Sequence, residues 1–199
     1  DVADISHNND MKLHIDGARI FNAAVAQDVD VKELVENVDS VTFCLSKGLS
    51  APVGSVVCGS EEFIYHARRN RKALGGGMRQ AGIIAAAGIF SLDNMLDQIR
   101  EDHKNAKYLA AGIDDIDGLS VDKGNIKSNI LYFDIDKEAE QSKKLAQQTK
   151  NVDLYPFEIV LNNIHFFETY PSRFRLVTHY GITRDDVEKT LGVLNKMIN

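Results

Sequence analysis

Cysteine is scarce in this sequence, and its arrangement excludes two kinds of protein. Cys44 and Cys58 are the two cysteines of the 199-residue chain, and they form no Cys-x-x-Cys motif and have no nearby histidine. This spacing fits neither a structural zinc site nor the disulfide framework of a small secreted domain. We therefore expect no bound metal and a reducing, cytoplasmic location.

Basic charge and long apolar runs are also scarce. The 23 Lys plus Arg are outnumbered by 29 Asp plus Glu, which gives a net charge of -6 and no basic face for a nucleic-acid partner. The longest apolar stretch, residues 81–90, is about half of what a bilayer span requires. The N-terminus also lacks the charged-then-apolar pattern of an export signal. We therefore expect neither a nucleic-acid nor a membrane partner.

What the sequence does contain is an alternation of strand and helix patterns. With 44% hydrophobic residues, the chain is long enough for one or two domains with their own cores. Alternating elements predict the α/β class. The patterns predict strands over 11–16, 40–46, 55–60, 119–122, 128–135, 153–160 (irregular) and 173–180, and helices over 18–27, 60–74, 78–113, 137–150 and 183–198. We expect helix 78–113 to be one long helix kinked near Gly88, and a domain boundary near residue 70, before the glycine triplet.

Asp16 is the first candidate functional residue. It lies in LHIDGARIFNA, at the end of a predicted strand and before a predicted helix. A side chain at the carboxyl end of a strand in an open α/β sheet faces the crevice where ligands bind. A carboxylate there needs a cation, either Arg19 or the protonated ring nitrogen of a cofactor. The Asp-Gly pair also suits a hairpin turn or a helix N-cap; the helix that follows argues against the hairpin and leaves the cap open.

Lys47 is the second candidate. It directly follows predicted strand 40–46 and stands among Ser46, Gly48 and Ser50. These small neighbours leave space around the amine, and removal of the amine from water would favour its neutral form, which is nucleophilic toward carbonyls. The alternative is an ordinary surface lysine in a loop. SKGLS lacks the glycine-rich lead of a phosphate-binding P-loop.

Arginines supply the remaining candidates. On predicted strand 173–180, Arg173, Arg175 and His179 share one face, and paired guanidinium groups suit a carboxylate. The same pattern fits an edge strand protected by charge, and a hydrogen-bonded structural role is expected for His179. Arg79, in GGGMRQ, could present a cation to an anion at the start of the long helix, whereas such glycines more often form only a linker.

Together these residues match the parts of a pyridoxal phosphate site. The aspartate would partner the pyridine nitrogen, the lysine would provide the amine that bonds to the cofactor, and an arginine from a second domain would hold the substrate carboxylate. The combination therefore says more than any one motif.

Four segments in order carry a resemblance to a known family: LHIDGARIFNA, LSKGLSAPVGSVV, RRNRKALGGGMRQAG and RFRLVTH. Over essentially its whole length the chain resembles the low-specificity threonine aldolases, pyridoxal phosphate enzymes with the aspartate-aminotransferase-like α/β fold. The resemblance implies that residues 1–70 are the C-terminal part of the large cofactor-binding domain. Residues 71–199 would then form the long helix and a small C-terminal α/β domain.

The resemblance also implies roles for individual residues. Lys47 would form the Schiff base with pyridoxal phosphate, and Asp16 would pair with its ring nitrogen. Arg19 and Arg175 would bind the carboxylate of the amino-acid substrate. Arg79 would contact the cofactor.

The implied reaction is the cleavage of L-threonine or L-allo-threonine to glycine and acetaldehyde by a homodimer or homotetramer. Lys72, like Arg79, matches a family position near the site. Three family features are not found in the sequence: a phosphate-binding Gly-Thr turn, a histidine stacked on the cofactor and a serine near the substrate carboxylate. The sequence is therefore expected to be the C-terminal part of such an enzyme.

Two other functions stay open. One is a different pyridoxal phosphate activity on the same scaffold, such as an aminotransferase or a β-eliminating lyase, although LHIDGAR and RLVTH favour the aldolase. The other is an inactive remnant that acts as an interaction subunit.

Overall fold

The computed structural model describes residues 2–136, 158–161, 164–170 and 172–198. The chain divides into two compact units, Asp1–Arg100 and Glu101–Asn199. The boundary expected near residue 70 falls inside the first unit, so the division into domains 1–70 and 71–199 stays a prediction.

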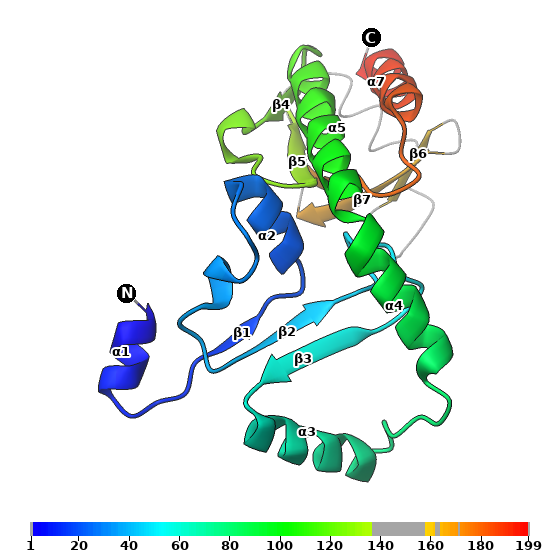
Figure 1. Ribbon diagram of the computed structural model, residues 1–199. Coiled ribbons are helices and arrows are strands. Elements are labelled where there is room, and N and C mark those ends of the chain that lie inside the picture. The colour runs from blue at the N-terminus through cyan, green and yellow to red at the C-terminus, as the bar shows by residue number, and fades with distance from the viewer. Residues whose placement is uncertain (1, 137–157, 162–163, 171, 199) are drawn as a thin grey trace. The chain divides into compact units, whose positions relative to one another are not determined.

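The first unit is built on a three-stranded sheet (Figure 1). Its elements are α1 (Val2–Asn8), β1 (His14–Asp16), α2 (Ile20–Gln27), a 3-10 helix (Glu33–Val35), β2 (Ser40–Cys44), β3 (Ser55–Gly59), α3 (Glu61–Ala73) and α4 (Gly82–Asn94), and α5 (Leu96–Asp114) begins in it. The strand order is β1-β2-β3, with β1 parallel to β2 and β2 antiparallel to β3. The predicted strand, helix and strand around Asp16 are confirmed as β1, α2 and β2.

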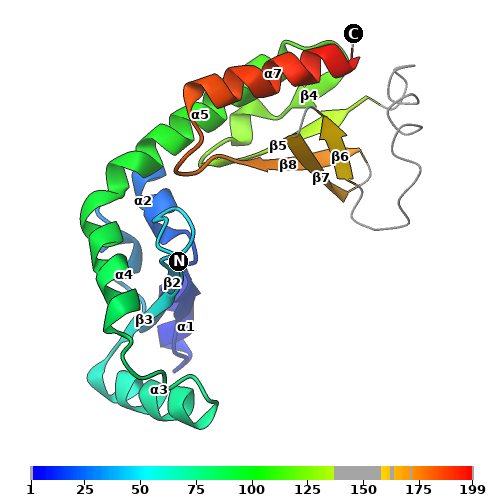
Figure 2. The same ribbon diagram turned by 90° about the vertical axis from the view of Figure 1, so that its right-hand side faces the viewer.

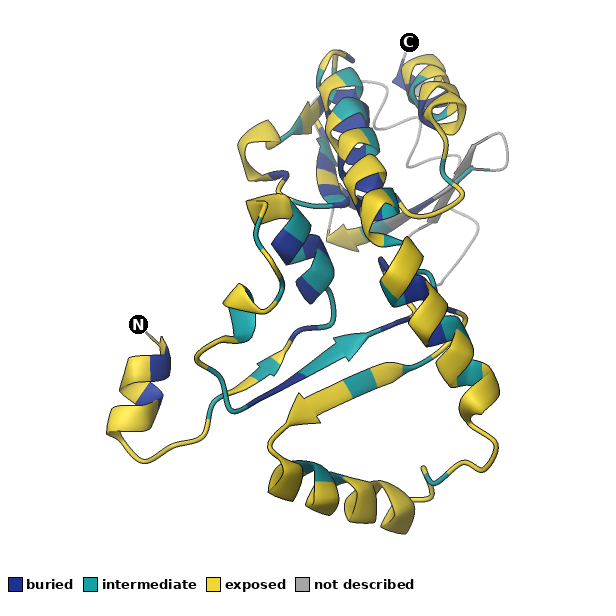
Figure 3. Ribbon diagram, viewed as in Figure 1, coloured by how far each residue is buried: buried dark blue, intermediate teal, exposed yellow. Residues whose placement is uncertain are grey.

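The two faces of this sheet differ in character. On one face Phe43 and Val56 pack against a core of Leu45, Leu49 and neighbouring apolar residues, and the ring of Phe43 meets that of Phe21 edge to face at 5.2 Å. The strand register places polar side chains on the other face: His14, Asp16, Ser40, Thr42 and Ser55. Most of β3 and α3 is exposed (Figure 3). Asp16 therefore lies on the less buried face of the sheet.

Helix α3 confirms its prediction in detail. The Ser60 side chain caps the helix by accepting a hydrogen bond from the Phe63 amide at 3.2 Å. Glutamates occupy the first turn, and Arg71 and Lys72 the last, where they complement the helix dipole.

The single long helix expected over 78–113 is wrong, because the structure has two helices that meet at Met95. Ser91 and Asn94 donate side-chain hydrogen bonds to the carbonyls of residues 87 and 90, a pattern that bends helices. Gly88, where a kink was expected, lies inside α4 and permits close packing instead. A Cβ at this position would lie 2.8 Å from a methyl carbon of Leu45.

The second unit is an antiparallel sheet covered by helices. Its elements after α5 are β4 (Leu119–Val121), a 3-10 helix (Lys123–Asn125), β5 (Ile130–Ile135), β6 (Glu158–Leu161), β7 (Ile164–Tyr170), β8 (Arg173–Val177) and α7 (Arg184–Ile198). The strand order is β4-β5-β8-β7-β6. Helices α5 and α7 lie side by side on this sheet (Figure 2), and Leu191 of α7 packs directly on Gly112 of α5.

A continuous core joins these layers. It contains Phe133, Phe166 and Phe174, with the rings of Phe133 and Phe174 stacked at 5.2 Å, and it extends to buried residues of both helices such as Ile113 and Leu194. The sequence patterns did not predict β7. The predicted helix 137–150 and the first part of strand 153–160 lie outside the described residues.

The predicted cap of the terminal helix is confirmed. The amide of Thr183 donates to the carboxylate of Asp186 at 2.9 Å, and the Asp186 amide donates to the Thr183 hydroxyl at 3.3 Å, which is a reciprocal capping box. The hydrogen bonds that the Asp186 carboxylate accepts from the Thr183 hydroxyl, at 2.7 Å, and from the Thr183 amide lower the pKa of Asp186. Among the described residues, none of the helices combines the length and the apolar character needed to cross a membrane.

Candidate active site

Asp16 is the last residue of β1 and lies opposite Thr42 in the parallel ladder with β2. The chain leaves the sheet at once, because the Gly17 amide still donates to the Thr42 carbonyl at 2.7 Å before α2 begins. The Asp16 side chain is exposed rather than enclosed in an apolar crevice. Within the described residues, its carboxylate forms no hydrogen bond or ion pair, so it is available to a ligand.

Arg19 precedes α2 at the N-cap position and is half-buried. It does not form the ion pair with Asp16 that was one of the expectations. Its Nε atom is buried and has no hydrogen-bond partner among the described residues. Because a buried donor without an acceptor is unfavourable, Arg19 is suited to an anion that reaches this end of the sheet.

Lys47 lies in a fixed loop that follows β2. The loop closes with a hydrogen bond from the Ser50 amide to the Lys47 carbonyl at 2.8 Å and another from the Ala51 amide to the Leu45 carbonyl at 3.0 Å. Leu45 and Leu49 anchor the loop in the core, whereas the Lys47 side chain is exposed. The fold thus holds the backbone and leaves the amine free to react.

A close contact joins the Lys47 loop to the helix that follows Asp16. Gly48 is buried against Asn22 of α2, and a Cβ at position 48 would lie 2.4 Å from the Asn22 side-chain oxygen. Asn22 is itself almost fully buried. Since β1 and β2 are also adjacent and parallel, Asp16 and Lys47 emerge from the same end of the sheet.

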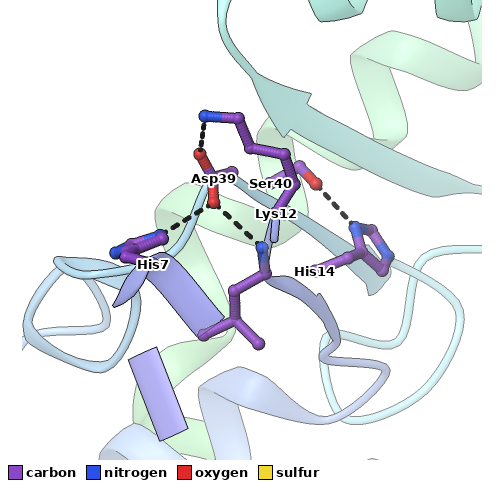
Figure 4. Close-up of polar contacts among 6 residues, drawn as sticks. His7, Lys12, His14, Asp39 and Ser40 are labelled. Atoms are coloured by element: carbon purple, nitrogen blue, oxygen red, sulfur yellow. Dashed lines mark hydrogen bonds and ion pairs between the residues drawn. The ribbon is translucent and has the colours of Figure 1, made fainter. Parts of the chain in front are cut away.

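Polar residues at the opposite end of β1 tie the N-terminal elements together (Figure 4). The carboxylate of Asp39 accepts hydrogen bonds from Lys12 Nζ at 2.8 Å, the Leu13 amide at 2.9 Å and His7 Nε2 at 3.0 Å. These contacts, that from Lys12 foremost, hold the pKa of Asp39 well below its ordinary value of 3.8. We call His7, Lys12, Leu13 and Asp39 the Asp39 clasp; sequence reasoning missed it, because no motif links its members.

His14 continues this network toward Asp16. Its Nδ1 is hydrogen-bonded to the buried Ser40 hydroxyl at 2.8 Å (Figure 4), and its Nε2 lies 3.3 Å from the Thr42 hydroxyl. The i, i+2 spacing of His14 and Asp16, which places both side chains on one face of a strand, is the only local signal of this network in the sequence. These hydrogen bonds link β1 to β2 next to Asp16.

In the second unit, β8 confirms the predicted alternation of its residues. Arg173 and Arg175 are exposed on one face, while Phe174 on the other is buried. Arg173 already forms a bidentate ion pair with Asp134 of β5, with both contacts at 2.8 Å. Arg175 has no such partner in the described part of the chain, so it is the arginine of this pair that is free for a ligand.

His179 is hydrogen-bonded, as expected, and its side chain is exposed. Its Nδ1 is hydrogen-bonded to the Tyr180 carbonyl at 2.8 Å. Arg79 is exposed and lies three residues before α4 begins at Gly82. The described residues contain no group of His, Cys, Asp or Glu that could hold a metal ion.

The glycines before Arg79 form a defined helix end rather than only a linker. Gly75 has a φ of 83°, and the amides of Gly75 and Gly76 donate to the carbonyls of Lys72 and Arg71 at 3.2 and 2.8 Å. This pairing is the Schellman motif. It folds the chain back over α3, so that Gly76 and Gly77 contact the stems of Arg71 and Lys72.

Comparison with known proteins gives a consistent result. A family model described as beta-eliminating lyase matches residues 1–136. The chain is 42% identical over 190 residues to low-specificity L-threonine aldolase 1 of Arabidopsis thaliana, covering 96% of this chain and 51% of that protein. It is 37% identical over 184 residues to the low specificity L-threonine aldolase of Escherichia coli (strain K12), covering 92% of this chain and 50% of that protein. The chain thus spans about half the length of the curated relatives it matches.

Solved structures agree on the fold. A putative L-allo-threonine aldolase from Listeria monocytogenes EGD-E matches 98% of this chain and 55% of its own with a TM-score of 0.75 at 17% identity. The threonine aldolase of Leishmania major matches 100% of this chain and 55% of its own with a TM-score of 0.70 at 17% identity. A likeness at this identity concerns the fold alone, and it confirms the predicted α/β fold class.

Proposed function

The chain belongs to the beta-eliminating lyase family, and from this membership we propose that it contributes to the pyridoxal phosphate-dependent cleavage of L-threonine or L-allo-threonine to glycine and acetaldehyde. One observation carries the proposal. Asp16 ends β1, Lys47 follows the adjacent parallel strand β2, and the loop of one packs on the helix of the other. The names of the curated relatives support the choice of substrate.

The residues present fit one side of a bound pyridoxal phosphate. Lys47 would supply the exposed amine that holds the cofactor through its aldehyde carbon, and Asp16 would supply the carboxylate that accepts a hydrogen bond from its ring nitrogen. When bound, the cofactor supplies an electron-accepting ring that stabilises the electron pair left on Cα as the Cα–Cβ bond breaks. By holding a proton on the ring nitrogen, Asp16 favours the charged ring by about 1.4 kcal/mol for each unit by which it raises the pKa of that nitrogen.

Arginines are proposed to bind the anionic groups. Arg19 is suited to a substrate carboxylate because its buried Nε lacks an acceptor within the described residues. Arg175 is proposed for the same carboxylate, since its neighbour Arg173 is already paired with Asp134. Arg79 is proposed as a cofactor-binding residue on the strength of the family motif. Binding by guanidinium groups would fix the orientation of the bond to be broken.

We also propose a homodimer or homotetramer and a cytoplasmic location. Helix α4 carries exposed apolar residues, Ile83, Ile89 and Phe90, on the side away from its own core. A helix that is apolar on all sides is normally buried, which supports an interface between copies. The two cysteines are unpaired, as in proteins of a reducing compartment.

A labelling experiment tests the assignment of Lys47. The chain is incubated with a limiting amount of pyridoxal phosphate, reduced with borohydride and mapped by peptide mass spectrometry. We expect the adduct on the peptide that contains Lys47 and its loss in a Lys47→Ala variant. Lys32→Ala is the matched control, because Lys32 is exposed in the same unit. An adduct that persists in Lys47→Ala overturns the assignment.

A product assay separates the alternatives. Acetaldehyde and glycine released from threonine, by the chain alone or together with the N-terminal half of a curated relative, identify an aldolase. An oxo acid in place of acetaldehyde identifies an aminotransferase or a β-eliminating lyase. No product under either condition, together with binding to a full-length relative, identifies an interaction subunit.

A further inference from the structure

A pocket lies between the polar face of the first sheet and α3. It has a volume of about 530 Å³ and is lined by residues that include Thr42, Ser55, Val57, Ile64, Arg68 and Arg71. Among the described residues that line it, none is acidic. We propose that this pocket binds a phosphate group, either free orthophosphate or the phosphate of an ester.

The charge of the pocket is unusual for this chain. The whole sequence carries a net charge of -6, yet the C-terminal half of α3 presents Arg68, Arg69, Arg71 and Lys72. Neither Arg68 nor Arg71 forms an ion pair with a described residue. Two guanidinium groups without carboxylate partners at one pocket create a local positive potential that attracts an anion.

The number of donors favours phosphate over a carboxylate. One guanidinium fork satisfies the two oxygens of a carboxylate, whereas a phosphate dianion has three terminal oxygens that accept several hydrogen bonds. Arg68 and Arg71 supply two forks, and the hydroxyl of Ser55 adds a further donor. Among the described residues, the Ser55 hydroxyl donates to the sulfur of Cys44 at 3.6 Å, a weak acceptor that a phosphate oxygen would readily replace.

The glycine turn holds one of these arginines in position. Gly76 lies against the stem of Arg71, where a Cβ would be 2.9 Å from Arg71 Cγ. The Schellman hydrogen bonds also occupy the carbonyls of Arg71 and Lys72, so these negative dipole ends are not left free beside the anion. The apolar residues Val57 and Ile64 form another part of the lining, which suits an ester with an apolar body.

The test measures phosphate affinity by calorimetry and by ³¹P line broadening at an ionic strength of about 0.15 M. Orthophosphate is titrated into the purified chain and into Arg68→Ala and Arg71→Ala. We expect each variant to bind at least about tenfold more weakly, because each loses a charge-assisted fork. Arg71→Lys keeps the charge and the aliphatic stem but not the guanidinium fork. Its affinity should therefore lie between that of the unchanged chain and that of Arg71→Ala. Circular dichroism melting confirms that each variant is folded.

Arg69→Ala is the matched control, because Arg69 belongs to the same helix but lies over the ring of Tyr65 instead of lining this pocket. We expect its affinity to stay within about twofold of the unchanged chain. An equal loss in Arg69→Ala shows only general attraction to a basic helix and overturns the proposal. So does unchanged binding in Arg68→Ala and Arg71→Ala.

Further arms identify the source of the phosphate and separate this site from the proposed function. If Arg71→Ala binds pyridoxal 5′-phosphate more weakly than the unchanged chain does but binds pyridoxal equally well, the pocket holds the phosphate of the cofactor. If Arg71→Ala binds pyridoxal 5′-phosphate as tightly as the unchanged chain does, the pocket holds free phosphate or another ester. Lys47→Ala should keep its orthophosphate affinity even if the aldolase proposal fails. A Lys47→Ala variant that loses this affinity contradicts a separate pocket.

Discussion

The two units of the chain differ in the size of the apolar core that each one buries. In the second unit, apolar side chains from α5, α7 and the five-stranded sheet form one continuous core around Phe133. In the first unit the described core is small, one face of the sheet is polar, and α3 has no buried residue. Asp16, Arg19, Lys47 and Arg79 all lie in this less buried unit. Arg175, the fifth candidate residue, lies on β8 of the second unit, so the candidate residues are not confined to the less buried unit.

The largest expected effect is on the core of the second unit. Phe133→Ala removes a ring that stacks on Phe174 and meets Phe166 edge to face. We expect the free energy of unfolding of this unit to fall by about 3–5 kcal/mol, measured by urea denaturation followed by circular dichroism. Tyr132→Ala, the exposed neighbour on the same strand, is the control and should cost much less. Equal losses would show that the continuous core is not the source of stability.

A smaller effect is expected in the first unit, at the junction of the two site elements. Gly48→Ala places a methyl group against Asn22 and should cost about 1–3 kcal/mol in unfolding free energy. It should also reduce the yield of the reduced adduct at Lys47, because the loop must move. Gly82→Ala has open space around its Cβ and should preserve both quantities. If Gly48→Ala gives the normal yield of adduct, the reactivity of Lys47 does not depend on the packing of its loop against Asn22.

The contribution of the Asp39 clasp to the stability of the first unit should depend on pH. Its hydrogen bonds lower the pKa of Asp39, so the clasp stabilises the fold at pH values above the ordinary 3.8. This contribution is lost as the pH falls from 3.8 toward the lower pKa of the folded state. Asp39→Asn should therefore be less stable than the unchanged chain at pH 7, and the difference should shrink below pH 3.8. Thermal melts at pH 7, 4 and 2.5 measure it.

The control for the clasp is Asp93→Asn, which removes an exposed carboxylate from α4 of the same unit. Its difference from the unchanged chain should be small at each pH. If the Asp39→Asn difference is equally large at pH 2.5 and at pH 7, its cause is not the charge of Asp39.

The smallest effect is expected at the exposed pair of Arg173 and Asp134 on the second sheet. Both side chains are about half exposed, and solvent screens such pairs strongly. We expect Arg173→Ala to shift the denaturation midpoint least of the four variants. A double-mutant cycle with Asp134→Ala measures the coupling, and a large value would show that surface charge also supports the more stable unit.

Local signals allowed much of the fold to be predicted. Ser60 followed by two glutamates predicted the start of α3. The apolar runs 40–46 and 55–60 predicted the strands on either side of the Lys47 loop. Strand β7 was not predicted. It is defined by its pairing with β6 and β8, and that pairing cannot be read from the residues of the strand itself. The break at Met95 was missed because it depends on side chains that bond back to helix carbonyls, whereas Gly88 offered a more obvious but misleading signal.

The candidate site was predictable only where a motif carried it. The strings around Asp16 and Lys47 identified both residues, and their emergence from adjacent parallel strands agrees with that choice. The Asp39 clasp could not be predicted, because Lys12 and His7 are 27 and 32 positions away from Asp39. The contact between Gly48 and Asn22 is likewise a product of folding. The sequence thus predicts the groups of the candidate site, whereas the contacts that support them come from distant segments.

The most direct test of the account concerns the ring nitrogen of the cofactor. Pyridoxal phosphate labelled with ¹⁵N in the ring is bound to the chain and to Asp16→Asn, and the nitrogen shift is recorded by NMR. We expect a protonated ring in the unchanged chain, a neutral ring in Asp16→Asn, and attachment at Lys47 in both. The same ring state in both chains would contradict the claim that Asp16 and Lys47 act on one cofactor.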